Sequence, residues 1–211
     1  MIFEPGQHIL FIGDSITDSA RNDEDSPYGN GFVSLIHAFV TARYPELQLR
    51  WTNRGISGNT VRDLADRWEE DAVQHKPDWL AIMVGANDCS RRYNPERISE
   101  AVYVEEYEST LRSLLQRSVD TSGCRLIIAE PYVVEADPTD QRLIDTRELC
   151  LAARRVARDM DAISIHTQEL FDNVLKSTNA TDWSPDRVHP NLAGHALIAS
   201  GFLKELGFSF D

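Results

Sequence analysis

Cysteine is scarce in this sequence of 211 residues. Its three cysteines, Cys89, Cys124 and Cys150, form no CxxC pair and stand at no other spacing typical of metal ligands. An odd and sparse set of thiols is typical of proteins in a reducing compartment. We therefore expect free thiols, no metal site and a cytoplasmic location.

Long hydrophobic runs are also missing. No segment approaches the roughly 18 consecutive apolar residues of a membrane-spanning helix, and the N-terminal stretch MIFEPGQHILFIGDS lacks the basic and apolar regions of a signal peptide. Basic residues are outnumbered, since 21 Lys and Arg face 34 Asp and Glu for a formal net charge of −13. Such a charge repels phosphate backbones and anionic lipids. We therefore expect a neutral small molecule as the partner, and neither nucleic acid nor a membrane.

The common cofactor motifs are absent too. The sequence contains no P-loop and no GxGxxG dinucleotide fingerprint. It also has no GxSxG nucleophile elbow. We therefore expect no cofactor.

What the sequence does contain is an alternation of short apolar runs with longer helical patterns. We expect strands at 8–13, 47–53, 78–85, 124–131 and 162–166. Helical patterns lie at 31–44, 61–76, 101–118, about 140–160, about 167–176 and about 191–205. Strands that alternate with helices form βαβ units, and these give a parallel sheet with helices on both faces. The pattern predicts a single α/β domain over residues 1–211.

Four polar loops stand where such a fold places its functional groups. In open α/β sheets, ligands bind at the carboxyl ends of the strands. GDSIT (13–17), SGNT (57–60) and GAND (85–88) follow the first three expected strands, and DRVH (186–189) precedes the last helix. We expect these loops to meet at one edge of the sheet.

Ser15 is the candidate nucleophile. A serine at a strand-to-helix turn exposes its hydroxyl, and its backbone N–H lacks a helical partner. Such a serine could attack a substrate and also help to bind the oxyanion that forms. Taken alone, a GDS sequence is more often a simple turn with a helix cap.

His189 and Asp186 are the candidate base and orienting carboxylate. A catalytic serine needs a base that titrates near neutral pH, and the base needs a carboxylate that fixes its tautomer. The Asp-x-x-His spacing on a loop allows the carboxylate to reach Nδ1 while Nε2 faces the serine. His195 lies within an apolar helix and is expected to be structural, whereas His166 remains a candidate for the rim of the site.

Gly58 and Asn87 are the candidate oxyanion donors beside the Ser15 N–H. A glycine allows the backbone to approach the substrate closely, and an asparagine amide is a neutral donor. Donors aimed at a developing oxyanion are what acyl transfer requires. Each of these residues alone would be read as an ordinary loop residue.

Together these blocks resemble the SGNH hydrolases, also called the GDSL esterase/lipase family. GDSIT, the glycine in SGNT, GAND and the late DxxHP stand in that family's order from the first strand to the final helix. The resemblance implies a three-layer α/β/α flavodoxin-like fold with a five-stranded parallel sheet and hydrolysis of esters. It also implies a catalytic role for each matching residue: Ser15 as nucleophile, His189 as base, Asp186 as third member, Ser15, Gly58 and Asn87 as oxyanion donors, and Asp14 and Asp88 as accessory loop residues.

The longer stretches GISGNTVRDLADRWEEDAVQHKPDW and DRVHPNLAGH resemble a carbohydrate-esterase branch, the intracellular acetylxylan esterases. That branch implies deacetylation of xylo-oligosaccharides. Loop aromatics that could stack on a pyranose are Tyr28, Tyr93 and Trp183, and Pro185 could reshape the rim beside Asp186. The branch includes oligomers, so we expect either a monomer or a homo-oligomer.

Three alternatives remain at the level of sequence. The same chemistry would serve a lysophospholipase, a thioesterase or an arylesterase. A catalytically dead glycan-binding relative is disfavoured because the triad and donor residues are all present. A flavin-binding flavodoxin-like module is disfavoured because acidic loops suit a cofactor phosphate poorly.

Overall fold

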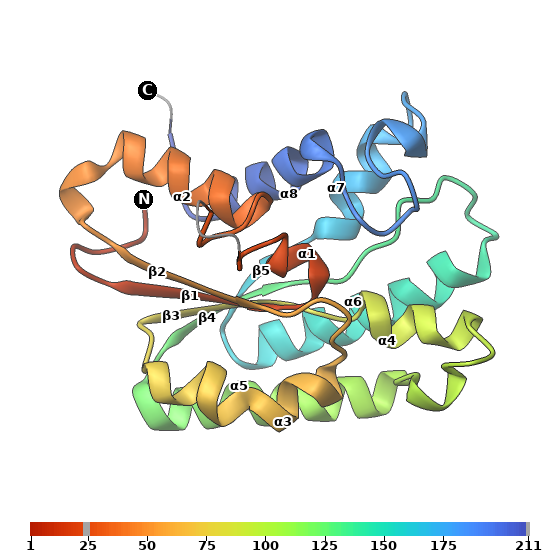
Figure 1. Cartoon of the computed structure of the whole chain (residues 1–211), viewed down its shortest axis with the longest axis horizontal. Coiled ribbons are helices and arrows are strands. Elements are labelled where there is room, and N and C mark those ends of the chain that lie inside the picture. The colour runs from red at the N-terminus through yellow and green to blue at the C-terminus, as the bar shows by residue number, and fades with distance from the viewer. Residues whose placement is uncertain (23–25, 210–211) are drawn as a thin grey trace.

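The computed structural model describes residues 1–22 and 26–209 and shows a five-stranded sheet in which all neighbouring strands are parallel. The strand order is β2-β1-β3-β4-β5, the flavodoxin-like order. This confirms the predicted fold class, and helices cover both faces of the sheet (Figure 1). The strands are β1 (His8–Gly13), β2 (Arg50–Gly55), β3 (Trp79–Met83), β4 (Arg125–Ala129) and β5 (Ile163–Ile165).

The helices form two layers. Above the sheet in Figure 1 lie α1 (Ser15–Asp18), α2 (Phe32–Arg43), α7 (Thr167–Val174) and α8 (Leu192–Glu205). The layer below contains α3 (Val61–Asp71), α4 (Ala86–Ser90), α5 (Val104–Ser122) and α6 (Gln141–Asp159). Short 3-10 helices span Pro45–Leu47, Val73–His75, Arg91–Tyr93, Ile98–Glu100 and Ala180–Asp182.

The core is divided by the sheet into two apolar clusters. Successive side chains of a strand point to opposite faces. Leu10 and Ile12 of β1 therefore join the cluster that contains residues of α3, α5 and α6. Ile9 and Phe11 join the cluster that contains residues of α2 and α8. All six residues of β1 are buried, and the strand is paired on both sides, with β2 and β3. The GDS loop at its end therefore starts from a rigid position.

The second strand begins later than the sequence predicts. The apolar residues at 47–49 suggested strand structure, but β2 starts at Arg50. Leu47 ends a 3-10 helix, and Gln48 adopts a left-handed conformation with φ of 45°. Leu47 and Leu49 pack against the core without being part of the strand. The apolar residues of this segment therefore indicated packing against the core and not an extended backbone.

Helix α5 is also displaced from its predicted range of 101–118. Ala101 and Val102 are buried, but Ala101 has an extended backbone and the helix starts only at Val104. Its C-terminus continues to Ser122, where Gly123 caps it in a left-handed conformation. A glycine in this position is a common helix stop signal.

Candidate active site

The GDS loop places Ser15 at the first position of α1, directly after β1. Asp14 is the N-cap residue, and its Oδ1 accepts a hydrogen bond from the Ile16 N–H at 3.0 Å. The N–H of Ser15 has no acceptor within its own helix, because a first-turn amide lacks one. The loop thus presents both a hydroxyl and a backbone donor at the carboxyl edge of the sheet.

The structure brings the three predicted triad residues into contact. Ser15 Oγ lies 3.0 Å from His189 Nε2, and His189 Nδ1 lies 2.6 Å from Asp186 Oδ2. If the histidine Nδ1–H donates to Asp186, Nε2 is free to accept the serine proton. The side chains of Asp186 and His189 are 51% and 56% exposed, so the pair stands open to solvent.

The loop that carries Asp186 and His189 is fixed by its own backbone. Asp186 Oδ1 accepts hydrogen bonds from the N–H groups of Val188 and His189, at 3.0 Å and 2.7 Å. Partial burial would raise the pKa of Asp186, but the hydrogen bonds from the His189 ring and from these amides hold it well below its usual range. The carboxylate therefore stays ionised wherever imidazole titrates. Arg187, between the two residues, adopts a left-handed conformation with φ of 72°.

The segment that follows β4 anchors this loop from outside. The Tyr132 hydroxyl donates to the Val188 carbonyl at 3.0 Å, and the Val134 N–H donates to the Arg187 carbonyl at 2.8 Å. The Arg187 guanidinium forms ion pairs with Glu135 and Asp140. The segment after β4 therefore determines where the His189 ring lies.

The two remaining oxyanion candidates lie on the loops after β2 and β3. Gly58 has φ of +84°, a conformation that L side chains rarely adopt, although a Cβ at this position would meet nothing within 4 Å. The requirement for glycine is thus one of backbone conformation. Asn87 lies in α4, and its Nδ2 donates to the Asn59 carbonyl at 3.0 Å. An amide nitrogen carries two hydrogens, so one remains for a substrate oxygen.

Asp14 and Asp88 are buried carboxyl groups beside these loops. In each, Oδ1 caps a helix: Asp14 accepts from Ile16, and Asp88 accepts from the Val61 N–H at 3.0 Å. In each, Oδ2 is buried and has no hydrogen-bond partner among the described residues. Burial raises the pKa of both groups to about 7, against the opposing effect of the amide hydrogen bonds. Asp14 thus caps its own helix α1, and Asp88 joins α4 to the start of α3.

The other histidines have partners within the fold. His195 is buried, and its Nδ1 accepts from the N–H of Phe32, the first residue of α2, at 3.2 Å. Burial, together with the charge of His189, lowers the pKa of His195 to about 4, so it is neutral at physiological pH. His166 lies 3.4 Å from Glu169 on α7.

The three loop aromatics that could stack on a sugar are each engaged in the fold. Trp183 donates through Nε1 to Thr178 Oγ1 at 2.8 Å, and the Tyr93 hydroxyl donates to Asp145 at 2.8 Å. The ring of Tyr28 lies 4.3 Å from that of His37. These contacts account for the positions of all three rings without a ligand.

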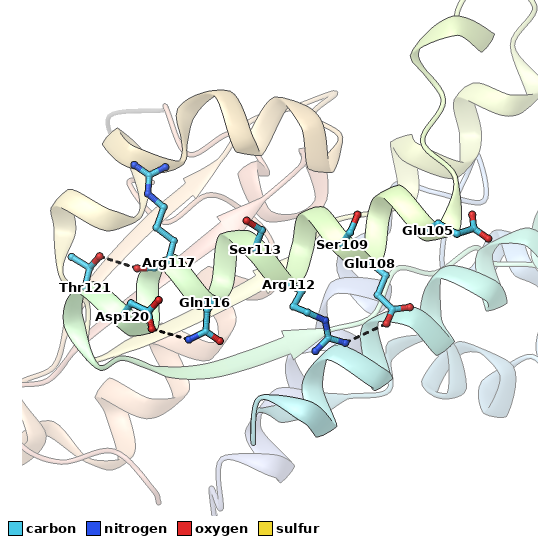
Figure 2. A pocket seen from close by; sticks show the side chains of 9 residues that line it. All are labelled: Glu105, Glu108, Ser109, Arg112, Ser113, Gln116, Arg117, Asp120 and Thr121. Carbon is cyan, nitrogen blue, oxygen red and sulfur yellow. Dashed lines mark hydrogen bonds and ion pairs between the residues drawn. The ribbon is translucent and has the colours of Figure 1, made fainter.

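A hollow of about 840 Å³ lies away from the triad, over the outward face of α5. Figure 2 shows that its lining comes from one helix, with Arg112 directed at Glu108 and Gln116 at Asp120. Because these polar groups pair with one another, the hollow is a solvated helix face. Within residues 1–22 and 26–209, no cluster of three or more potential metal ligands occurs. No helix in the same part of the chain is long and apolar enough to cross a membrane.

Sequence reasoning missed the arginines that hold the site loops, because a helical arginine ordinarily indicates a solvated face. Arg67 and Arg91 are both largely buried, with side chains 14% and 9% exposed. Arg91 donates through Nη2 to the Gly58 carbonyl at 2.6 Å. Their positions in the sequence could have indicated this role. Arg91 follows the GAND loop by three residues, and Arg67 lies about two helical turns after Thr60, on the same face of the helix.

A flavodoxin-like α/β sheet that carries a hydrogen-bonded Ser-His-Asp set at its carboxyl edge defines the class of serine hydrolases. A family model, the GDSL-like Lipase/Acylhydrolase family, matches residues 11–197. The chain belongs to this family and is a carboxylic ester hydrolase.

Particular relatives match along the whole chain. An acetylxylan esterase of Geobacillus stearothermophilus is 41% identical over 212 residues, which cover 97% of this chain and 96% of that protein. The crystal structure of Axe2, an acetylxylan esterase of the same organism, superposes with a TM-score of 0.95 at 39% identity, covering 99% of this chain and 98% of that one. LAE5, an alpha/beta hydrolase enzyme from the metagenome of Lake Arreo in Spain, gives a TM-score of 0.93 at 39% identity, with 98% of each chain covered.

Proposed function

We propose that this esterase removes acetyl groups from acetylated xylo-oligosaccharides, with Ser15 as nucleophile, His189 as base and Asp186 as orienting carboxylate. The observation that carries the catalytic assignment is the continuous chain of contacts at 3.0 Å and 2.6 Å through the His189 ring. The acetylxylan substrate is supported by relatives of that name that match nearly the full chain at 39–41% identity.

The reaction follows from this geometry as a two-step acyl transfer. His189 Nε2 accepts the proton of Ser15 Oγ as the oxygen attacks the ester carbonyl, and Asp186 stabilises the imidazolium that results. The N–H groups of Ser15 and Gly58 and the free hydrogen of the Asn87 amide stabilise the oxyanion. As the bond between the acyl carbon and the sugar oxygen breaks, His189 protonates that oxygen, and the acetyl group stays on Ser15. Water repeats the sequence on the acetyl-enzyme and releases acetate.

The openness of the triad suits a bulky alcohol component. More than half of the His189 and Asp186 side chains is exposed, so a sugar ring can approach this side of the site directly from solvent. The three cysteines are free and buried, which supports the cytoplasmic location proposed here.

The test is acetate release from acetylated xylo-oligosaccharides, run beside 4-nitrophenyl acetate and 4-nitrophenyl octanoate. We expect rapid release from the sugar, slower hydrolysis of the acetyl nitrophenyl ester and little of the octanoyl ester. The Ser15→Ala variant should fold and lose nearly all turnover. Preference for the octanoyl ester would contradict the substrate proposal and favour a lysophospholipase or thioesterase.

A further inference from the structure

Arg67 of α3 links the loops of the site from beneath. Its side chain is 14% exposed. The guanidinium donates from Nη2 to the Gly13 carbonyl at 3.0 Å, from Nη1 to the Arg54 carbonyl at 2.9 Å, and from Nε to Asn59 Oδ1 at 2.7 Å. A fourth contact, from Nη1 to Asp71 Oδ2 at 2.7 Å, joins it to its own helix.

These contacts reach every segment that carries a proposed oxyanion donor. Gly13 precedes the Asp14-Ser15 pair at the end of β1, and Arg54 lies in β2, just before the Gly58 loop. Asn59 follows Gly58, and its carbonyl accepts the hydrogen bond from Asn87 Nδ2 at 3.0 Å. One side chain therefore contacts the first two loops directly and the third through Asn59.

We propose that Arg67 is a positioning residue for the oxyanion hole, acting through Asn59 on Gly58 and Asn87 and through Gly13 on the Ser15 loop. The inference rests on the proposed function, because it assumes that these three groups stabilise the oxyanion. Arg67 itself touches neither the serine hydroxyl nor the histidine.

The chemistry of arginine fits this task. Its planar guanidinium spreads five donors over three nitrogens in fixed directions, whereas the three donors of a lysine ammonium all radiate from one nitrogen. Burial lowers the pKa of Arg67, and the hydrogen bond that its guanidinium donates to Asp71 opposes this shift. Fixed donors matter because oxyanion stabilisation depends on groups that are already aimed before the reaction starts.

A purely structural role makes a different prediction. Asp71 contacts the same guanidinium from the helix side, and α3 also buries Leu64 and Trp68 against the core. Loss of the Asp71 contact should therefore loosen the helix while leaving the Gly13, Arg54 and Asn59 contacts of Arg67 intact. Loss of the Asn59 side chain should disturb the loops and leave the helix contact intact.

The experiment compares Arg67→Met, Asn59→Ala and the control Asp71→Asn for kcat, KM and denaturant unfolding, with 4-nitrophenyl acetate as substrate. We expect kcat to fall on the order of 100-fold in Arg67→Met and about 10-fold in Asn59→Ala, with KM changed by less than about threefold. Asp71→Asn should lose stability but keep kcat within about twofold. In the Arg67→Met, Asn59→Ala double variant the losses should not add, because both changes break the same contact.

Two further variants separate this inference from the proposed function. If Ser15→Ala or Asn87→Ala retained full activity, the proposed site itself would be wrong. Loss of activity in both Ser15→Ala and Asn87→Ala would support the site. If Asn59→Ala and Arg67→Met then had the same kcat as the control Asp71→Asn, the positioning role of Arg67 would be refuted. Asn59→Ala leaves Arg67 and its other contacts in place, so the test survives even if Arg67→Met fails to fold.

Discussion

Asp186 and His189 are joined at 2.6 Å although more than half of each side chain is exposed. An exposed ion pair is ordinarily weak, because water competes for both partners. Here the carboxylate is held by two backbone N–H groups of its own loop, which direct Oδ2 toward the ring. Orientation of the imidazole therefore comes from a closed turn and not from burial of the aspartate.

The first prediction concerns this carboxylate. Asp186→Asn should lower kcat on the order of 10³-fold, because an amide can no longer select the His189 tautomer or stabilise the imidazolium. KM should change little. Asp182→Asn removes an exposed carboxylate from the same region and should leave kcat within about twofold. An Asp186→Asn enzyme with near-normal kcat would exclude the orienting role.

The second prediction concerns the conformation of Gly58. A Cβ would meet nothing within 4 Å at Gly58 or at Gly123, and both have positive φ, of 84° and 69°. Alanine at either position should therefore cost about 1 kcal/mol of stability through backbone strain alone. Only Gly58→Ala should also lower kcat, by at least about 10-fold, because its N–H would turn away from the oxyanion. Equal kcat in the two variants would remove Gly58 from the oxyanion hole.

The third prediction follows from the pKa values of Asp14 and Asp88, which burial raises to about 7. An unfolded chain releases these protons near pH 4. Between about pH 4 and pH 7 the folded protein therefore binds more protons than the unfolded chain, so these groups lower the free energy of unfolding as pH rises. Asn is neutral throughout, and the stability of Asp14→Asn relative to wild type should climb with pH, by up to about 1.4 kcal/mol per unit.

Urea unfolding between pH 4.5 and pH 7.5 measures this difference. Asp66→Asn, which removes an exposed carboxylate from α3, serves as the control and should show no such trend. A constant stability difference between Asp14→Asn and wild type across this range would mean that Asp14 is ionised throughout.

The fourth prediction concerns Arg187, which separates the two triad residues in a left-handed conformation. Arg187→Ala and Arg187→Gly both lose the ion pairs to Glu135 and Asp140, but only the glycine relieves the backbone. We expect Arg187→Gly to be more stable than Arg187→Ala by about 1 kcal/mol in denaturant unfolding. We also expect both to lose kcat, since the loop has lost its outer anchor. Equal stability would show that the left-handed turn costs nothing.

The sequence was sufficient to predict a parallel sheet with helices on both faces and to identify the loops that form the site. Four of the five strands fall within their predicted ranges, because short apolar runs with flanking turn residues identify buried parallel strands. The contact between Ser15 and His189 could be expected because GDSIT and DRVH match, in order, blocks of the SGNH hydrolases.

Other features depend on tertiary structure that periodicity does not reveal. Helix α4 was expected to be a turn, since five residues are too few to show a helical pattern. The connections made by Arg67 were hidden for a different reason. Its acceptors are mostly backbone carbonyls, and these are present at every position of any sequence.

Ser15 and His189, the proposed nucleophile and base, are 174 positions apart in the chain. The Ser15 loop, Gly58 and Asn87 are all translated within the first half, whereas His189 arrives just ahead of the final helix α8. On the proposed mechanism, a growing chain on the ribosome therefore carries Ser15 without its base until synthesis is almost complete. For the same reason, activity should return during refolding only after the C-terminal segment has docked beside the Ser15 loop.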